Sequence, residues 1–160
     1  MAFDAFVKLT GINGPVVRKE VAKFMEIYSF SFGASNPVSI NSGGGMGAGK
    51  VSLSSMNFMK KSDATSPELF QACCTGKHFD EVLVQLFKAG GTQGKFIEYK
   101  LEDVMVESVQ WSGSGGGDDT PTESVSLAFQ KIEIMYQSQD DKGNVGKPII
   151  GKWDQAMAKA

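Results

Sequence analysis

The chain has 160 residues, of which 41% are hydrophobic and 21% are charged, a mixture typical of one folded domain over residues 1–160. Sixteen basic and 18 acidic residues give a formal net charge of −2, which argues against an electrostatic nucleic-acid binder. No apolar run approaches the ~18–20 residues of a membrane span. The first residues also lack the basic and apolar regions of a signal peptide, so we expect no membrane insertion and, if exported, another export route.

Alternation of apolar and polar residues predicts strands along most of the chain. The expected strands are residues 3–9, 26–33, 50–60, 81–89, 96–101, 104–111 and 123–136. In the second strand, Tyr28, Phe30 and Phe32 face one side, while Ser29 and Ser31 face the other. Aromatic platforms for nucleic acid lie in basic grooves, so in this slightly acidic chain we assign the aromatic side to the core. The serine side is then polar and in contact with water.

The last of these strands changes phase. Its apolar residues have odd numbers as far as Phe129 and even numbers from Ile132 onward. A β-bulge near Gln130 or Lys131 explains this change, because one extra residue reverses the side to which later side chains point. A strand that is buried on both sides is the alternative, and the sequence does not separate the two.

One segment has the pattern of a helix. Ser66 is a suitable N-cap, Pro67 suits the first helical position, and Gly76 ends the segment. We interpret residues 16–25 as a loop that runs into a strand, and residues 137–151 as a loop before a final short segment. Many short strands, glycine turns and one helix predict a mainly β fold: a small antiparallel β-barrel of two packed sheets with a short flanking helix.

Glycine is unusually frequent, with 19 residues, and several of them cluster in residues 43–49. Residues 44–50 superficially match a phosphate-binding loop. That loop needs a Ser or Thr after its lysine and then a helix, whereas Val51 and a strand pattern follow Lys50. We therefore predict a long loop, glycine-rich because its backbone bends or packs closely.

The remaining reactive residues do not form a recognisable catalytic or metal-binding motif. Cys73 and Cys74 are adjacent, a spacing that rarely fits disulfide geometry, so we expect free thiols. His78 is the single histidine and has no second motif beside it. Asp118, Asp119 and Glu123 lack the spacing of a calcium loop and are interpreted as a solvated turn. We predict no enzyme, no cofactor and no metal site.

Several stretches, taken in order, resemble one known family. They are residues 4–9, 30–33, 47–51, 73–79, 88–91 and 122–129, with Ile132 and Tyr136 beyond. Together they are similar to the haemolysin-coregulated protein (Hcp) family, the tube-forming component of bacterial type VI secretion. The resemblance spans nearly the whole chain. This chain departs from the family at Phe30 and Phe32, where the family often has tryptophan, and in residues 14–23.

The resemblance implies a hexameric ring that stacks into a tube inside a contractile sheath and below a spike protein. It also implies effector proteins in the ring lumen, assembly in the bacterial cytoplasm, and export by the type VI apparatus without a signal peptide. On this basis we hypothesise that Ser29 and Ser31 line the lumen. A second hypothesis assigns a contact with a neighbouring subunit or ring to one loop: Ser42, Gly43, Gly44, Gly45, Met46, Gly47, Ala48, Gly49 and Lys50.

Two other functions remain open at this point. The tail-tube protein of a phage or another contractile particle shares this architecture. A monomeric β-barrel that binds a small ligand belongs to a different class, and the mass of the protein in solution distinguishes it from a ring.

Overall fold

The computed structural model describes the chain except residues 1–2, 42, 90–93, 118, 141 and 143. Its strands are β1 (Phe3–Leu9), β2 (Met25–Ile27), β3 (Ser29–Ser31), β4 (Ala34–Ser35), β5 (Val38–Ile40), β6 (Met46–Ala48), β7 (Ser52–Leu53), β8 (Met56–Lys61), β9 (His78–Lys88), β10 (Lys95–Ser112), β11 (Thr122–Tyr136) and β12 (Ile149–Asp154). The helices are α1 (Ser66–Thr75) and a short 3₁₀ turn, η1 (Lys19–Val21).

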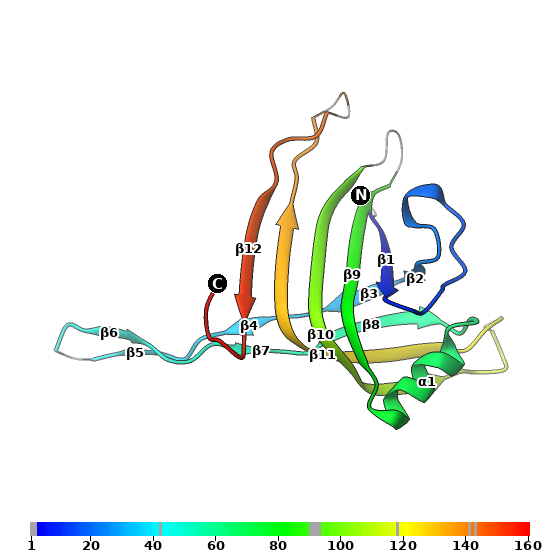
Figure 1. Cartoon of the computed structure of the whole chain (residues 1–160), viewed down its shortest axis with the longest axis horizontal. Helices are drawn as coiled ribbons and strands as arrows, with labels where there is room; N and C mark the ends of the chain where they lie inside the picture. The colour runs from blue at the N-terminus through cyan, green and yellow to red at the C-terminus, as the bar shows by residue number, and fades with distance from the viewer. Residues whose placement is uncertain (1–2, 42, 90–93, 118, 141, 143) are drawn as a thin grey trace.

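Eight of the strands form one antiparallel sheet that folds round into a nearly closed barrel (Figure 1). The order is β2-β1-β9-β10-β11-β8-β3, and β12 pairs with β11. The two ends of this path are consecutive in the chain, because only Tyr28 separates β2 from β3. The backbone N–H of Tyr28 donates to the carbonyl oxygen of Met59 at 2.8 Å. The predicted antiparallel barrel with one flanking helix is confirmed, and its two layers belong to one continuous sheet.

Strands β10 and β11 pass through both layers of the barrel. The sequence predicted two strands, residues 96–101 and 104–111, but the structure has a single bent strand, β10. The bend contains Asp103, whose φ of 54° lies in the left-handed region. Aspartate tolerates this conformation better than most residues. The break in the sequence pattern therefore marks a corner of the strand and not its end.

The pairing of β10 with β11 shows where the bulge lies. Glu102 pairs with Lys131 and Val104 pairs with Phe129, so the register is unbroken at Gln130. The bulge predicted near Gln130 or Lys131 is therefore wrong, and the bend accommodates the phase change without an inserted residue.

The register shifts elsewhere in this pair, between Val106 and Ser108, so the inserted residue is Glu107. The alternative explanation, a β11 that is buried on both sides, is also wrong along its full length, because Ile134 and Tyr136 are exposed.

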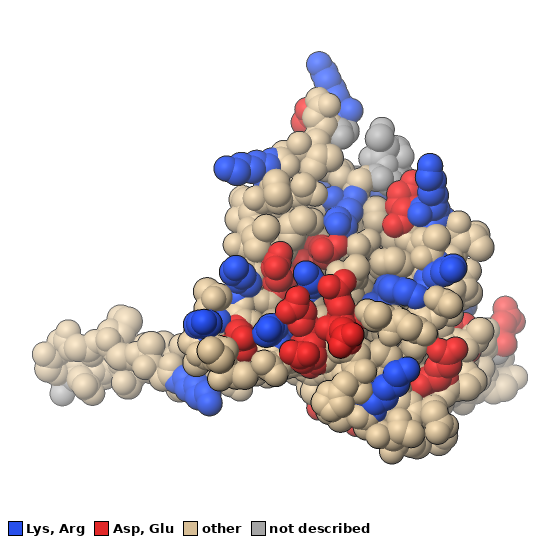
Figure 2. All heavy atoms as spheres, in the orientation of Figure 1, with Lys and Arg blue, Asp and Glu red and all other residues tan. Residues whose placement is uncertain are grey.

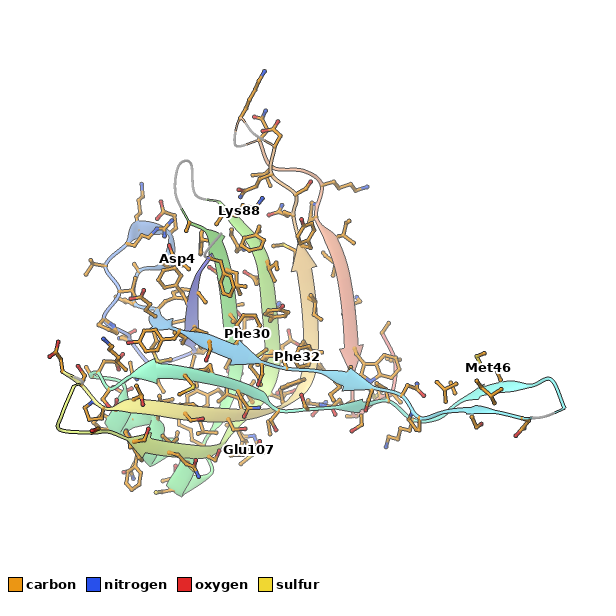
Figure 3. All side chains as sticks on the ribbon, turned by 180° about the vertical axis from the view of Figure 1, so that it is seen from behind. Asp4, Phe30, Phe32, Met46, Lys88 and Glu107 are labelled. Carbon is orange, nitrogen blue, oxygen red and sulfur yellow. The ribbon has the colours of Figure 1, made fainter. Side chains whose placement is uncertain are left out.

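The aromatic side of the second predicted strand is only partly as expected. Phe30 and Phe32 pack against the core, with ring centroids 5.5 and 6.1 Å from Tyr99, which confirms their assignment (Figure 3). Tyr28 does not join them, because 51% of it is exposed. The chain turns at Tyr28 from β2 to β3, which lies in the other layer. At this corner the side that faces the core changes from odd-numbered residues such as Ile27 to even-numbered residues such as Phe30.

The predicted helix is confirmed as α1. Gly76 follows it with a φ of 66°, the left-handed conformation of a helix C-cap. Ser66 is the first helical residue, and the N-cap position is Thr65, one residue earlier than predicted. Residues 16–24 form the expected loop, which contains η1, and it runs into β2 at Met25. Within the described residues, no helix combines the length and apolarity that a membrane crossing requires.

Candidate functional site

One face of the barrel is covered mostly by uncharged polar side chains, with Met59 as its apolar member. It is the side of β3, β8, β11 and β10 that points away from the core. The strand register places Ser31, Asn57, Ser126 and Ser108 in one row across these four strands, and Ser29, Met59, Ser124 and Gln110 in the next row. We call these eight residues the serine face. Residues of the opposite parity, such as Phe58 and Val125, are buried beneath it.

Both serines singled out from the sequence lie on this face. Ser29 and Ser31 are exposed and flank Phe30, which points to the core, as alternation in a strand requires. The other six members were missed, although the alternating pair Ser124 and Ser126 carried a similar signal. What the sequence did not contain is the register that places four separate strands side by side.

One carboxylate borders the serine face. Glu107 is exposed in the bulge of β10, and the hydroxyl of Ser126 donates to its Oε1 at 2.6 Å. Hydrogen bonds from Ser126 and Ser55 lower the pKa of Glu107, because they stabilise its ionised form. No basic side chain among the described residues forms an ion pair with Glu107. Glu107 therefore places a negative charge at one edge of the face, and Lys61, exposed two residues after Met59 on the same side of β8, places a positive charge beyond the other edge.

Residues 34–53 leave the barrel as a two-stranded arm (Figure 1). β4 pairs with β7 at its base, and β5 pairs with β6 further out. At the described part of the tip, the backbone N–H of Asn41 donates to the carbonyl oxygen of Gly45 at 2.9 Å. Gly44 has a φ of 92°, a conformation that glycine adopts without strain.

The arm presents one apolar side. Val38, Ile40 and Met46 are 56%, 77% and 75% exposed, and the pairing of Ile40 with Met46 places them on the same side as Val38. No charged residue occurs between residues 33 and 49. Figure 2 shows the same feature as an arm without acidic or basic side chains along its outer part. Exposed apolar surface of this kind marks an interaction site more often than a solvated loop.

The structure corrects the expectation of a simple glycine loop over residues 42–50. Residues 46–48 are strand β6, whereas Ser42 lies outside the described residues. Gly43, Gly44 and Gly45 form the described part of the turn, and Gly49 and Lys50 lead to β7. Because Lys50 precedes a strand and not a helix, the phosphate-loop geometry is absent from this described segment.

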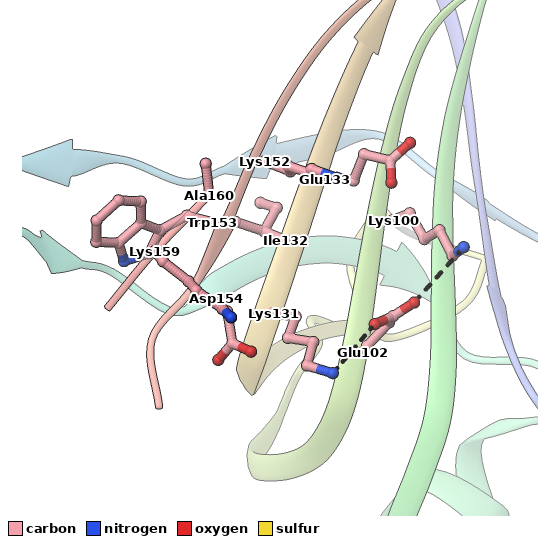
Figure 4. Close-up of a pocket in the computed structure, with 10 residues that line it drawn as sticks. All are labelled: Lys100, Glu102, Lys131, Ile132, Glu133, Lys152, Trp153, Asp154, Lys159 and Ala160. Atoms are coloured by element: carbon pink, nitrogen blue, oxygen red, sulfur yellow. Dashed lines mark ion pairs between the residues drawn. The ribbon is translucent and has the colours of Figure 1, made fainter. Parts of the chain in front are cut away.

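A second surface carries charges of both signs (Figure 2). The Nζ atom of Lys100 lies 3.7 Å from Glu81 and 3.5 Å from Glu102, and Lys131 lies 4.0 Å from Glu102. Glu81 first and Glu102 second raise the pKa of Lys100. All of these residues except Glu81 border a cavity of about 180 Å³ (Figure 4), lined by Lys100, Glu102, Lys131, Ile132, Glu133, Lys152, Trp153, Asp154, Lys159 and Ala160. Four basic and three acidic side chains line the cavity, so neither sign dominates it.

The remaining candidates lie apart from one another. Cys73 and Cys74 are free cysteines on α1, as predicted, and His78 is the exposed first residue of β9. Asp118 lies outside the described residues. Glu123 was assigned to a solvated turn, and this is wrong, because its side chain is fully buried in β11. Among the described residues, no three His, Cys, Asp or Glu side chains gather in a group that fits a metal ion.

Comparison with known proteins gives consistent matches. The model of a family described as "Type VI secretion system effector, Hcp" matches residues 6–136. Protein hcp1 of Pseudomonas aeruginosa is 36% identical over 156 residues, which cover 96% of each chain. A solved structure described as a type six secretion system protein superposes with a TM-score of 0.94 at 31% identity, over 99% of both chains. Hcp1 from Salmonella typhimurium superposes with a TM-score of 0.82 at 28% identity, again over 99% of both chains.

Proposed function

The chain belongs to the Hcp family of type VI secretion proteins, and we propose that it is a tube subunit that acts as a hexameric ring. In this proposal, rings stack into a secreted tube and the serine face lines the lumen. The partners are further copies of the chain, the sheath and spike proteins of the apparatus, and effector proteins. The protein assembles in the bacterial cytoplasm and is then expelled, and its role is structural and not catalytic.

The observation that carries the proposal is the apolar side of the arm. A second exposed apolar surface lies elsewhere, where Tyr136 on β11 pairs with Ile149 on β12 and where Ile134 is also exposed. Two different surfaces on one chain favour head-to-tail contacts, in which each subunit offers one surface to the next. Such contacts produce closed rings or open filaments, depending on the rotation between subunits.

The chemistry of the serine face suits a lumen wall. Hydroxyl and amide groups remain hydrated and bind donors and acceptors alike, so no single contact with a passing protein is strong. A wall of this kind retains cargo loosely and lets it slide. By contrast, an exposed aromatic or charged wall holds cargo at fixed points.

Ring formation is tested by the mass of the purified protein in light scattering. We expect about six times the subunit mass of 17.2 kDa. Deleting Gly43, Gly44 and Gly45 from the arm should prevent tube assembly and leave the subunit folded. The matched control deletes Gly115, Gly116 and Gly117 from another glycine-rich loop. Normal tubes from the arm deletion would refute the arm's role, and a mass of 17.2 kDa for the unaltered protein would favour a monomeric ligand-binding barrel.

The lumen assignment is tested separately at Ser31. A Ser31→Trp variant should retain rings but lose most of the effector that co-purifies with them, because the indole fills space and removes a hydrated hydroxyl. Ser114→Trp, at an exposed serine outside the face, is the control. Unchanged effector recovery with Ser31→Trp would count against this role.

A further inference from the structure

The serine face by itself does not discriminate by charge. Each hydroxyl donates and accepts hydrogen bonds, and the amides of Asn57 and Gln110 also do both. A lumen lined only by these groups holds acidic and basic segments equally. Any preference among cargo proteins must come from a group that departs from this pattern. Glu107 is the charged group beside the row of Ser126, whereas Lys61 lies beyond the opposite row.

The bulge determines where the Glu107 carboxylate lies. Because the register shifts between Val106 and Ser108, Glu107 is an additional residue in β10 without a partner in β11. Its side chain lies on the side of Ser126, whose hydroxyl donates to Oε1 at 2.6 Å. Figure 3 shows Glu107 in the lower layer, away from the aromatic residues Phe30 and Phe32.

The Glu107 carboxylate keeps room for another donor. A carboxylate has two oxygens with about four lone-pair positions, and the serine hydroxyls donate to only part of them. The remaining positions suit an ammonium or a guanidinium group, which forms the stronger, charge-assisted hydrogen bond. Elsewhere on the barrel, Glu81 and Glu102 already face Lys100, whereas no basic side chain among the described residues is paired with Glu107.

We infer that Glu107 makes the serine face selective for cationic polypeptide segments, so that effectors presenting Lys or Arg are retained better than neutral or acidic ones. The inference rests on the proposed function, in which this face lines the lumen. In a ring, Glu107 recurs once in every subunit and forms a belt of carboxylates. A cationic segment then finds an acceptor whichever subunit it approaches.

The test uses rings of the full chain and three fluorescent decapeptides of alternating sequence, Lys–Ser, Gly–Ser and Glu–Ser. Binding is measured by fluorescence anisotropy at low salt. We expect the Lys–Ser peptide to bind most tightly, and Glu107→Gln to weaken its binding roughly twofold to fivefold, the range of an exposed ion pair. Glu107→Lys should reverse the order, so that the Glu–Ser peptide binds best. High salt should remove the preference, because it screens exposed charges.

The control is Glu26→Gln, which removes the same charge from an exposed position on β2, outside the serine face. If Glu26→Gln weakens Lys–Ser binding as much as Glu107→Gln does, the preference comes from net charge and the inference is overturned. Rings of correct mass without any charge preference would also overturn it and leave the proposed function intact. If the mass shows no rings, the proposed function fails, and the same titrations on the monomer still decide whether Glu107 selects cationic segments.

Discussion

Lys60 and Glu123 lie directly opposite each other on β8 and β11 and form an ion pair whose two side chains are fully buried. Their charged atoms are 2.8 Å apart. Asp63 accepts a second hydrogen bond from Lys60, and the indole N–H of Trp111 donates to the other oxygen of Glu123. A buried charge is tolerated only when it is paired and hydrogen-bonded, and here both members are.

We therefore predict that Glu123→Leu destabilises the subunit by about 3–5 kcal/mol, the usual cost of leaving one buried charge without its partner. The double variant Lys60→Met/Glu123→Leu should recover much of this loss, because neither charge is then buried. The free energy of unfolding in urea measures both. If the double variant is less stable than Glu123→Leu, the buried charge is not the cause of the loss.

Glu107 should make the stability of the subunit depend on pH. Its pKa is lowered in the folded protein, so its hydrogen bonds stabilise the fold above the ordinary value of 4.5. This contribution is lost as the pH falls through the lowered pKa. The stability advantage of the unaltered protein over Glu107→Gln should therefore shrink as the pH falls from about 6 to below 4.5. Urea unfolding at several pH values checks this, and a difference that stays constant would contradict the role of the Ser126 and Ser55 hydroxyls.

Gly14 should not tolerate a side chain. A Cβ atom there would overlap the carbonyl oxygen of Phe24 and lie 2.8 Å from the backbone nitrogen of Met25. Gly14→Ala should therefore displace the loop that precedes β2 and cost about 1–3 kcal/mol, as overpacking does elsewhere. Gly45→Ala is the matched control, because a Cβ atom there meets nothing within 4 Å. Equal unfolding free energies for the two variants would contradict the close approach.

The apolar side of the arm should be required for assembly but not for folding. Ile40→Asp and Met46→Asp place a charge on surfaces that are 77% and 75% exposed in the subunit, so its unfolding free energy should change by less than about 0.5 kcal/mol. Desolvating the new carboxylate in a contact is costly, so rings should be lost. Ser39→Asp alters the opposite side of the same hairpin and should retain rings. Light scattering of the three variants measures the particle mass and so shows whether rings form. Intact rings from Met46→Asp would exclude this side as a contact.

Much of the barrel was predictable from local pattern. The helix follows from a proline at its start and a glycine after it, and the alternation of residues 29–32 placed Phe30 and Phe32 in the core. The arm was not predicted, because β5 and β6 are exposed on both sides and therefore lack the contrast on which strand prediction depends.

Errors arose where the chain turns a corner. Tyr28 and Asp103 each lie where the backbone changes layer. The corner at Tyr28 separates β2 from β3 and changes which side is buried, whereas the corner at Asp103 interrupts the sequence pattern without ending β10. Sequence periodicity reports which side of a strand is apolar, but it does not report that the strand bends.

The sequence by itself determined the class of fold, the position of the helix and the aromatic core, because these depend on neighbours within a few residues. Only the tertiary structure decided that Glu123 is buried against Lys60, that Glu107 stands in a bulge, and that seven polar residues and Met59 share one face. Each of these depends on the register between strands that are distant in the chain. Register is chosen by the packing of the whole barrel, and no local pattern contains it.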